Sequence, residues 1–217
     1  MEKFDVIILP PGGYGGTLGE DGTERLAAWI RGGGVAIAWG GSASFLRGES
    51  FGATYVSPEE LPEDSVEAIR ARIEAAAPAG TVLPPVTSPG ADPASEMAVP
   101  GAFLRARVDR THWLTYGFEA DALPVMMRSR ALPLSEDGAN PVVFAEGADL
   151  VSSGWSWPEN TPRAYGGRAY ATVDDVGRGR IVLFAEEPVY RLTFDGPVGL
   201  LMNAIYIGTR GLRDAAR

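Results

Sequence analysis

Two short runs of apolar residues near the start of the chain predict strands that are buried on both faces. They cover residues 4–9 and Val35–Trp39. Between them, apolar residues recur at helical spacing over residues 23–31, and the glycines at 32–34 are expected to end that helix. A strand, a helix and a second strand in this order predict two neighbouring parallel strands joined by a right-handed crossover.

The stretch "PPGGYGG", which follows the first strand, is expected to form a loop, because proline and glycine disfavour both helix and strand. Residues 57–98 are rich in proline, alanine and acidic residues, and residues 64–76 have the periodicity of an amphipathic helix. A strand pattern resumes directly afterwards. We therefore expect residues 57–98 to be an insertion within a single domain that spans residues 1–217.

The second half of the chain shows mainly strand patterns. Apolar and charged residues alternate in Ala102–Val108, which is typical of a half-exposed strand. Shorter strands are expected over residues 141–145 and 149–155. Residues 168–185 predict a β-hairpin with its turn at 177–179.

A final apolar segment, residues 195–208, predicts a buried helix. Asp195 is placed to cap this helix, Pro197 lies in its first turn and Gly208 ends it. Together with the preceding elements, the segment predicts one α/β domain, in which a parallel sheet with antiparallel additions is flanked by helices.

Charge and cysteine content exclude several classes of function. The 217 residues carry a formal net charge of −9, so the chain lacks the basic field that attracts nucleic acid or an anionic membrane. It has no cysteine, which excludes disulfides, thiolate nucleophiles and thiolate metal ligands. No apolar run approaches the roughly 20 residues that span a bilayer. Residues 1–9 lack the basic and long apolar regions of a signal peptide.

Several longer strings resemble known families. "FDVIILPPGGYG" and the later "WIRGGGVAIAWGGSASFL" resemble degenerate members of the class I glutamine amidotransferase-like fold. "VPGAFLRARVDRTHWLTYGF", "SGWSWPEN", "VGRGRIVLFAEEPVYR" and "LLMNAIYIG" are similar to the C-terminal domain of bacterial zinc carboxypeptidase A-like (M14-type) peptidases. The "DRTHWLTYG" and "GRGR" segments are also similar to trehalose-utilisation-type relatives of the same fold.

The resemblance implies a flavodoxin- or amidotransferase-like, mostly parallel sheet flanked by helices, with an antiparallel hairpin added. It also implies a partner, the catalytic domain of the parent peptidase, which would be secreted or periplasmic and would hold the zinc in its own domain. This chain is expected to need no cofactor. Such domains carry a further β-α-β unit before the first strand. We therefore expect the isolated chain to form a homodimer through the vacated flank or to be poorly soluble.

The turn after the second strand corresponds to the place where active amidotransferases carry a cysteine nucleophile. The resemblance puts Trp39 there, and an indole has no nucleophilic atom, so we expect no catalytic residue in this chain. Ligands bind at the carboxyl edge of open α/β sheets. Candidates for a vestigial small-ligand pocket at this edge are Tyr14, Trp39, Gly40, Gly41 and Ser42.

Ser42 would need a base to act as a nucleophile, and His112 is the single histidine of the chain. We expect His112 to be a packed residue that bonds a backbone carbonyl. Asp109, Glu119 and Asp121 show no regular ligand spacing around it, so we expect no metal site in this chain.

Two tryptophans and two glutamates complete the candidate sites. Trp155 and Trp157 project to the same side of an extended chain, either as an aromatic platform for a sugar or peptide or as a docking surface for another domain. Glu186 and Glu187 are adjacent, so they point to opposite faces of a strand and are not expected to share a site.

These observations favour a non-catalytic accessory domain of a zinc carboxypeptidase-like protein, with a structural role or a role in holding a substrate or partner. The alternative is a small-molecule or carbohydrate-binding domain of the trehalose-utilisation type. A more distant alternative is a serine hydrolase that uses Ser42. An apolar patch beside Trp155 and Trp157 favours docking, whereas an enclosed polar cleft at the strand–helix turn favours ligand binding.

Overall fold

The computed structural model of the chain describes residues 3–56, 99, 101–157, 160–192 and 194–209. The helix expected over residues 64–76, and the whole of the expected insertion at 57–98, lie outside the described residues.

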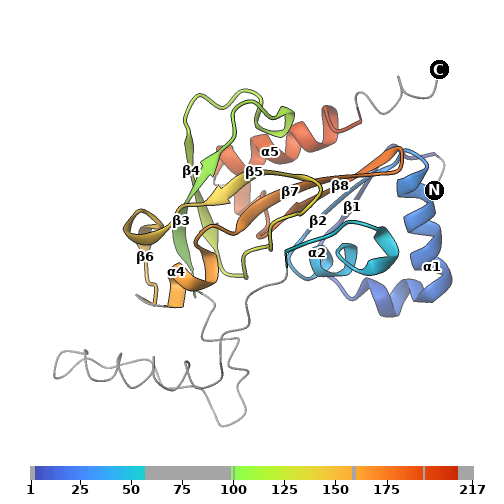
Figure 1. Ribbon diagram of the computed structural model, residues 1–217, viewed down its shortest axis with the longest axis horizontal. Helices are drawn as coiled ribbons and strands as arrows, with labels where there is room; N and C mark the ends of the chain where they lie inside the picture. Colours follow the sequence, from blue (N-terminus) through green and yellow to red (C-terminus); the bar gives the residue numbers. More distant parts are fainter. Residues whose placement is uncertain (1–2, 57–98, 100, 158–159, 193, 210–217) are drawn as a thin grey trace, which may run out of the picture.

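One mixed sheet runs through the molecule, with its strands in the order β1-β2-β8-β7-β5-β3-β4 and with β6 paired to β3 (Figure 1). The strands are β1 (Val6–Leu9), β2 (Val35–Trp39), β3 (Ala102–Val108), β4 (Ala122–Met127), β5 (Ala139–Phe144), β6 (Val151–Gly154), β7 (Ala169–Val176) and β8 (Gly179–Phe184). The helices that pack on the sheet or connect its strands are α1 (Tyr14–Arg31), α2 (Gly41–Leu46), α4 (Asn160–Tyr165) and α5 (Asp195–Tyr206).

The parallel part of the sheet is formed by β1, β2 and β8. β1 pairs in parallel with β2, as the sequence predicts, and α1 connects the two strands. β2 pairs in parallel with β8 on its other side. The other pairings described are antiparallel, so the antiparallel part of the sheet extends beyond the predicted hairpin. The predicted α/β fold, with a sheet flanked by helices and antiparallel strands added to a parallel part, is confirmed. The antiparallel share is larger than predicted, because two of the described strand pairings are parallel and five are antiparallel.

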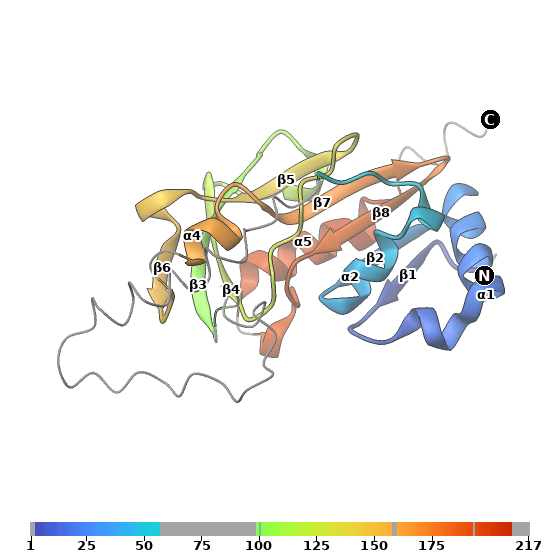
Figure 2. The same cartoon turned by 60° about the horizontal axis from the view of Figure 1, so that its bottom comes forward.

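The predicted hairpin is formed by β7 and β8, and its turn contains Gly177, whose φ of 63° favours glycine. Gly179 is already the first residue of β8. The tip of the hairpin reaches the C-terminal end of α1 (Figure 2), where the Arg178 N–H donates to the Arg31 carbonyl at 2.9 Å. This contact joins the antiparallel part of the sheet to the β1-α1-β2 unit.

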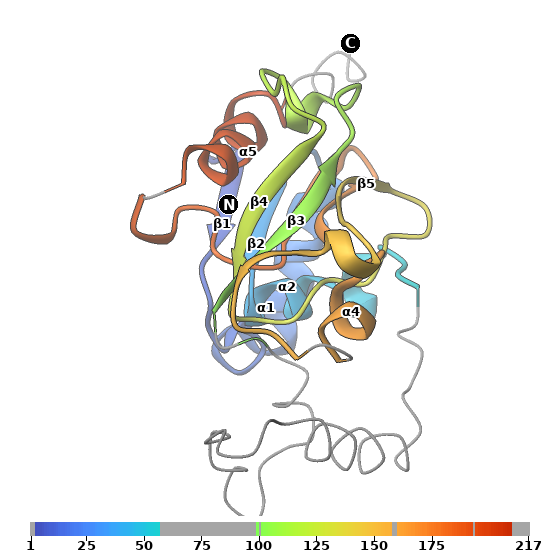
Figure 3. The same cartoon turned by 90° about the vertical axis from the view of Figure 1, so that its left-hand side faces the viewer.

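The helices cover both faces of the sheet, with α1 and α2 on one face and α5 on the other (Figures 1 and 3). The register places Asp175 opposite Arg180, so these two side chains lie on the same face of the sheet. The Arg180 guanidinium donates to the Gly208 carbonyl just after α5, so this is the face that α5 covers. Asp174 projects to the other face, where the hydroxyl of Tyr55 donates to it at 2.8 Å. β2 lies in the middle of these layers, and all five of its residues are buried.

Helix α1 starts earlier than the sequence indicates. The glycine-rich stretch that was expected to be a loop provides its first turns, from Tyr14 onward, where the Tyr14 ring packs against Phe45 of α2. Gly19 has non-helical dihedrals, with φ 64° and ψ −171°, and separates these first turns from the main helix. The prediction of a loop is confirmed for residues 10–13 and wrong for residues 14–16, where a tertiary contact outweighs the low helix propensity of glycine.

Helix α5 differs from its predicted form in two ways. Its N-cap is Phe194, with no side-chain hydrogen bond, and Asp195 lies inside the first turn instead of capping it. Leu200 and Ala204 are buried, but Met202 and Tyr206 are 42% and 66% exposed. The helix therefore packs against the sheet with one side only, and the prediction of a buried helix is wrong for the other side.

Candidate functional site at the carboxyl edge of the parallel strands

The chain leaves β2 through a sharp turn and enters α2 at Gly41. Gly40 lies at the tip of that turn, with φ 59° and ψ −133°, and a positive φ favours glycine. In enzymes that use a strand–turn–helix of this kind, the residue at the strained tip presents the nucleophile. The expectation that Trp39 takes this position is wrong. Trp39 ends β2 with 6% of its surface exposed, and Gly40 offers no side chain.

Ser42 is fully buried in the first turn of α2, and its hydroxyl donates to the Pro10 carbonyl at 2.5 Å. Pro10 directly follows β1, so this bond ties the start of α2 to the end of the neighbouring strand. A base that activated Ser42 would have to displace this bond. The arrangement is suited to holding the turn in place.

His112 lies at the opposite edge of the sheet from Ser42. β3 runs antiparallel to β5, β5 antiparallel to β7, and β7 antiparallel to β8. The end of β3 is therefore at the edge where β8 and β2 begin. His112 follows β3, whereas Ser42 follows β2, so the two side chains do not meet. The structure does not assemble a serine–histidine pair from them.

The sequence predicts that His112 bonds a backbone carbonyl, but in the structure its side chain accepts a hydrogen bond from a backbone N–H. Its Nδ1 accepts from the Leu114 N–H at 3.1 Å and thereby caps the short helical turn Trp113–Thr115. Burial lowers the pKa of His112, and the neighbouring Asp109 carboxylate opposes the shift. The neutral imidazole is the form that can accept this bond.

The two adjacent glutamates after β8 have different environments, in agreement with the prediction that they do not share a site. Glu186 is buried, and Glu187 is half-buried. One carboxylate oxygen of Glu186 accepts from the backbone N–H groups of Arg128 and Ser129 at 2.8 and 3.0 Å. The Ser129 hydroxyl donates to the same oxygen at 3.1 Å, and the Arg128 guanidinium reaches the other oxygen at 3.2 Å.

This carboxylate fastens the segment that follows β4 across the carboxyl edge of β8. The Ser129 hydroxyl is 2.7 Å from the Ala185 carbonyl, and the Tyr165 hydroxyl donates to the Ser129 carbonyl at 2.9 Å. The Arg128 guanidinium lies 4.2 Å from the centre of the Tyr190 ring. No local pattern in the sequence marks Arg128 or Ser129, because 57 residues or more separate them from Glu186 in the chain.

A second buried carboxylate, Asp174, lies near the edge at which β8 begins. It is 4% exposed and accepts from the hydroxyls of Tyr55 and Ser135. Burial raises the pKa of Asp174, and these hydrogen bonds oppose the shift. A hollow of about 320 Å³ beside it is also lined by Thr54, His112 and other residues. The feature of the sequence that could have identified this site is an acidic residue, Asp174, at an inward-facing position of a predicted hairpin strand.

The remaining members of the predicted vestigial pocket lie around the strand–helix turn without forming a shared polar cluster. Tyr14 is half-buried, and its ring centre is 6.2 Å from that of Phe45. The indole N–H of Trp39 is buried and has no hydrogen-bond partner among the described residues. A side chain added at Gly41 would meet no atom within 4 Å.

Trp155 and Trp157 lie together just after β6, as their spacing predicts. Their ring centres are 4.3 Å apart and their planes are inclined at 79°, which is an edge-to-face contact. Trp155 is 43% exposed, and Trp157 is half-buried. The preceding residues 152–154 are also exposed. An exposed aromatic side chain therefore stands beside an exposed stretch of strand.

Among the residues that the structure describes, no three His, Cys, Asp or Glu side chains are grouped so that they could hold a metal ion. None of the helices in the same ranges combines the length and apolarity needed to cross a membrane.

Comparison with solved structures finds similarity in fold, whereas comparison by sequence finds no relative. No family model matches the chain, and no curated protein matches it. The structure is similar to that of Cytoplasmic Protein STM3548 from Salmonella typhimurium, with a TM-score of 0.48 and 10% sequence identity, covering 94% of this chain and 72% of that one.

Proposed function

We propose that this chain is a non-catalytic, amidotransferase-like accessory domain that binds the catalytic domain of a zinc carboxypeptidase-like protein. The observation that carries the proposal is that the polar side chains at the carboxyl edge of β2 and β8 are hydrogen-bonded within the chain itself. The Ser42 hydroxyl is buried and bonded to a backbone carbonyl, and the Glu186 carboxylate accepts hydrogen bonds from its own chain. Gly40, at the tip of the turn, has no side chain.

These features matter because open α/β sheets bind ligands at this edge. A nucleophile must be presented at the tip of the turn, and a base or acid must have a free position toward the substrate. Here the hydrogen-bonding capacity of both groups serves to hold the backbone. A structural role accounts for both groups, whereas turnover would require each of them to break its bonds.

The tryptophan pair supports docking as the way in which the domain acts. Large aromatic side chains that are held in one orientation form the anchors of many protein interfaces. Trp155 is exposed and is held edge-to-face against Trp157. The alternative, a flat platform for a sugar, is less well supported, because the two ring planes are inclined at 79° and do not form one continuous surface.

The absence of catalysis is tested with the purified chain and three substrates: glutamine, a p-nitrophenyl ester and a short peptide. We expect no turnover of any of them. Turnover that disappears in Ser42→Ala would overturn the proposal and establish the serine hydrolase alternative. Turnover that persists in Ser42→Ala would overturn it as well, and would direct attention to another residue.

Docking is tested by titrating the chain calorimetrically into the catalytic domain of a zinc carboxypeptidase from the same organism. We expect binding that Trp155→Ala weakens about 30-fold, because truncating an anchoring tryptophan costs about 2 kcal/mol or more. The matched control is Tyr206→Ala, which removes a 66% exposed aromatic ring from α5 and should leave binding unchanged. Failure to bind the peptidase domain, with binding of a disaccharide to the same chain, would support the carbohydrate-binding alternative instead.

A further inference from the structure

The two ends of the sheet are protected to different degrees against pairing with another strand. At the β4 end, the Val108 N–H donates to the Asp121 carbonyl. Because backbone directions alternate along an antiparallel pair, Pro124 of β4 then faces outward. A proline offers no N–H to a further strand and is a common means of blocking an exposed edge.

Within β1 itself the strand has no such protection, and the first proline, Pro10, comes directly after its last residue. The Val35 N–H donates to the Asp5 carbonyl at 2.9 Å. In a parallel pair, the backbone groups of successive residues point alternately toward the partner strand and away from it. The groups of Ile7 therefore point toward β2, and those of Val6 and Ile8 point outward. β1 itself reads Val-Ile-Ile-Leu, without a charge, a proline or a bulge. Among the described residues no strand pairs with its outer edge.

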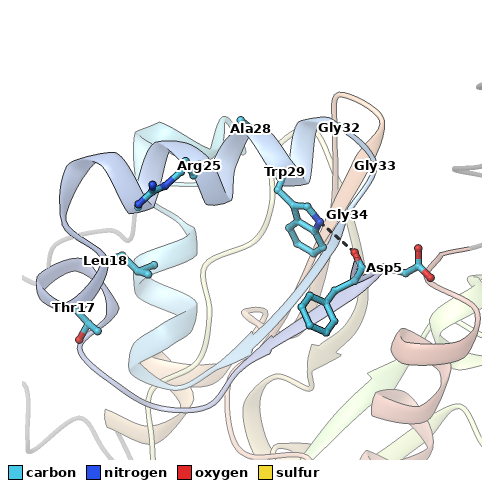
Figure 4. Close-up of a pocket in the computed structure, with 11 residues that line it drawn as sticks. Asp5, Thr17, Leu18, Arg25, Ala28, Trp29, Gly32, Gly33 and Gly34 are labelled. Carbon is cyan, nitrogen blue, oxygen red and sulfur yellow. Dashed lines mark hydrogen bonds between the residues drawn. The ribbon is translucent and has the colours of Figure 1, made fainter. Parts of the chain in front are cut away.

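Side chains at the same edge are incompletely covered. Ile8 is 37% exposed and Phe4 is 63% exposed, whereas every residue of the neighbouring β2 is buried. A groove of about 990 Å³ runs between the start of β1 and α1, lined by Phe4, Leu18, Trp29 and others (Figure 4). The Trp29 indole donates to the Phe4 carbonyl at 3.2 Å, which holds this stretch of chain against α1.

Charge indicates which partner fits this edge. The chain carries a net charge of −9, so two copies repel each other over most of their surfaces. The charged residues that line the groove are Asp5 and Arg25, which have opposite signs. Two copies related by a two-fold axis bring the same surface together. Here that surface combines an uncharged strand with one acidic and one basic residue, so the repulsion between the two net charges is not concentrated at this edge.

We propose that two copies of this chain associate through β1, with the two β1 strands antiparallel about a two-fold axis at Ile7. The outward backbone groups of Val6 in one copy then pair with those of Ile8 in the other, and the two sheets become one continuous sheet. The arrangement buries the exposed side chain of Ile8. This interface is separate from Trp155, which lies on the strand segment beside β3.

Sedimentation equilibrium of the full chain tests the proposal. We expect a dimer for the wild-type chain. Ile8→Pro removes an outward N–H, and Ile8→Lys places a charge at the strand pairing, so each should raise the dissociation constant about 100-fold. The matched control, Met202→Lys, introduces the same charge at a 42% exposed position on α5 and should leave the dimer intact.

A monomeric wild-type chain at about 100 μM, a concentration at which interfaces of micromolar affinity are filled, would overturn the proposal. A dimer that both Ile8 variants leave intact would also overturn it, because the interface would then lie elsewhere. Circular dichroism establishes that each variant is folded. Backbone hydrogen exchange gives an independent measurement, in which the Val6 and Ile8 amides are protected in the dimer and exchange faster in Ile8→Lys.

Discussion

The parallel and antiparallel parts of this sheet are stabilised in different ways. In the parallel part, β2 is buried along its whole length between β1 and β8, and α1 contributes buried apolar residues such as Leu26 and Ile30 to the same core cluster. The antiparallel part is held in addition by two buried carboxylates that accept hydrogen bonds from residues far away in the sequence. Asp174 lies on β7, and Glu186 follows β8 and accepts from the segment after β4. Burial of apolar side chains thus stabilises the parallel part, and hydrogen bonds to buried carboxylates contribute in addition to the stability of the antiparallel part.

The difference follows from how the segments are connected. The parallel strands β1 and β2 are joined by a helix, which packs on the sheet and buries it as a consequence of the crossover. Apart from the β7–β8 hairpin, the antiparallel strands are joined by mainly irregular segments, whose backbone groups need partners when they are buried. Glu186 accepts from two backbone N–H groups of the segment after β4, and Asp174 accepts from the side-chain hydroxyls of Tyr55 and Ser135.

The largest effect is expected where the two parts meet. A Cβ added at Gly179, the first residue of β8, would lie 1.8 Å from the Ile30 carbonyl oxygen and 2.4 Å from that of Gly34. Gly179→Ala should therefore reduce the free energy of unfolding by about 3 kcal/mol, since backbone must move to relieve the overlap. Urea unfolding measures this loss. Gly41→Ala is the control, because nothing lies within 4 Å of its added Cβ. Equal losses in the two variants would show that the contact of Gly179 with the Ile30 and Gly34 carbonyls is not tightly packed.

A smaller loss is expected from removing the carboxylate that fastens the antiparallel part. Glu186→Ala leaves the part-buried N–H groups of Arg128 and Ser129 without their acceptor, and each costs about 1–1.5 kcal/mol, the low end of the range for an unsatisfied donor. We expect a total loss of about 3 kcal/mol or less in the free energy of unfolding, and faster exchange of these two amides. Glu187→Ala, at the half-buried neighbour, should change stability by about 0.5 kcal/mol or less. If the Arg128 and Ser129 amides exchange as slowly as in the wild-type chain, the carboxylate does not hold this segment.

The smallest effect concerns the pH dependence of the antiparallel part. Because burial lowers the pKa of His112 in the folded chain, the folded state favours the neutral ring. The stability that this provides is present above the ordinary histidine pKa of about 6.5 and is lost as pH falls through the lower, folded value. The single histidine makes the titration directly readable by NMR, and we expect a midpoint below 6.5. Asp109→Asn should lower the midpoint further, since Asp109 favours the charged ring. A midpoint above 6.5 in the wild-type chain would contradict this description.

The elements of the parallel part were predictable from the sequence because their signals are local. A run of apolar residues in Val35–Trp39 and the crossover rule are enough to place β1 beside β2 in parallel. The hairpin β7–β8 was predictable for the same reason, since Gly177 marks its turn. The early start of α1 was not predictable, because it depends on the contact between Tyr14 and Phe45, which lie 31 residues apart in the chain.

The sequence by itself determined the fold class, the adjacency of β1 and β2, and the exclusion of thiol chemistry, because each depends on composition or on neighbours in the chain. Only the tertiary structure decided that Gly40 forms the tip of the turn after β2, that Ser42 bonds Pro10, and that Glu186 holds the segment after β4. These features depend on backbone dihedrals and on contacts between residues distant in sequence. The physical reason is that a buried polar group takes whichever partner the packed chain brings within hydrogen-bonding distance, and no local pattern specifies that partner.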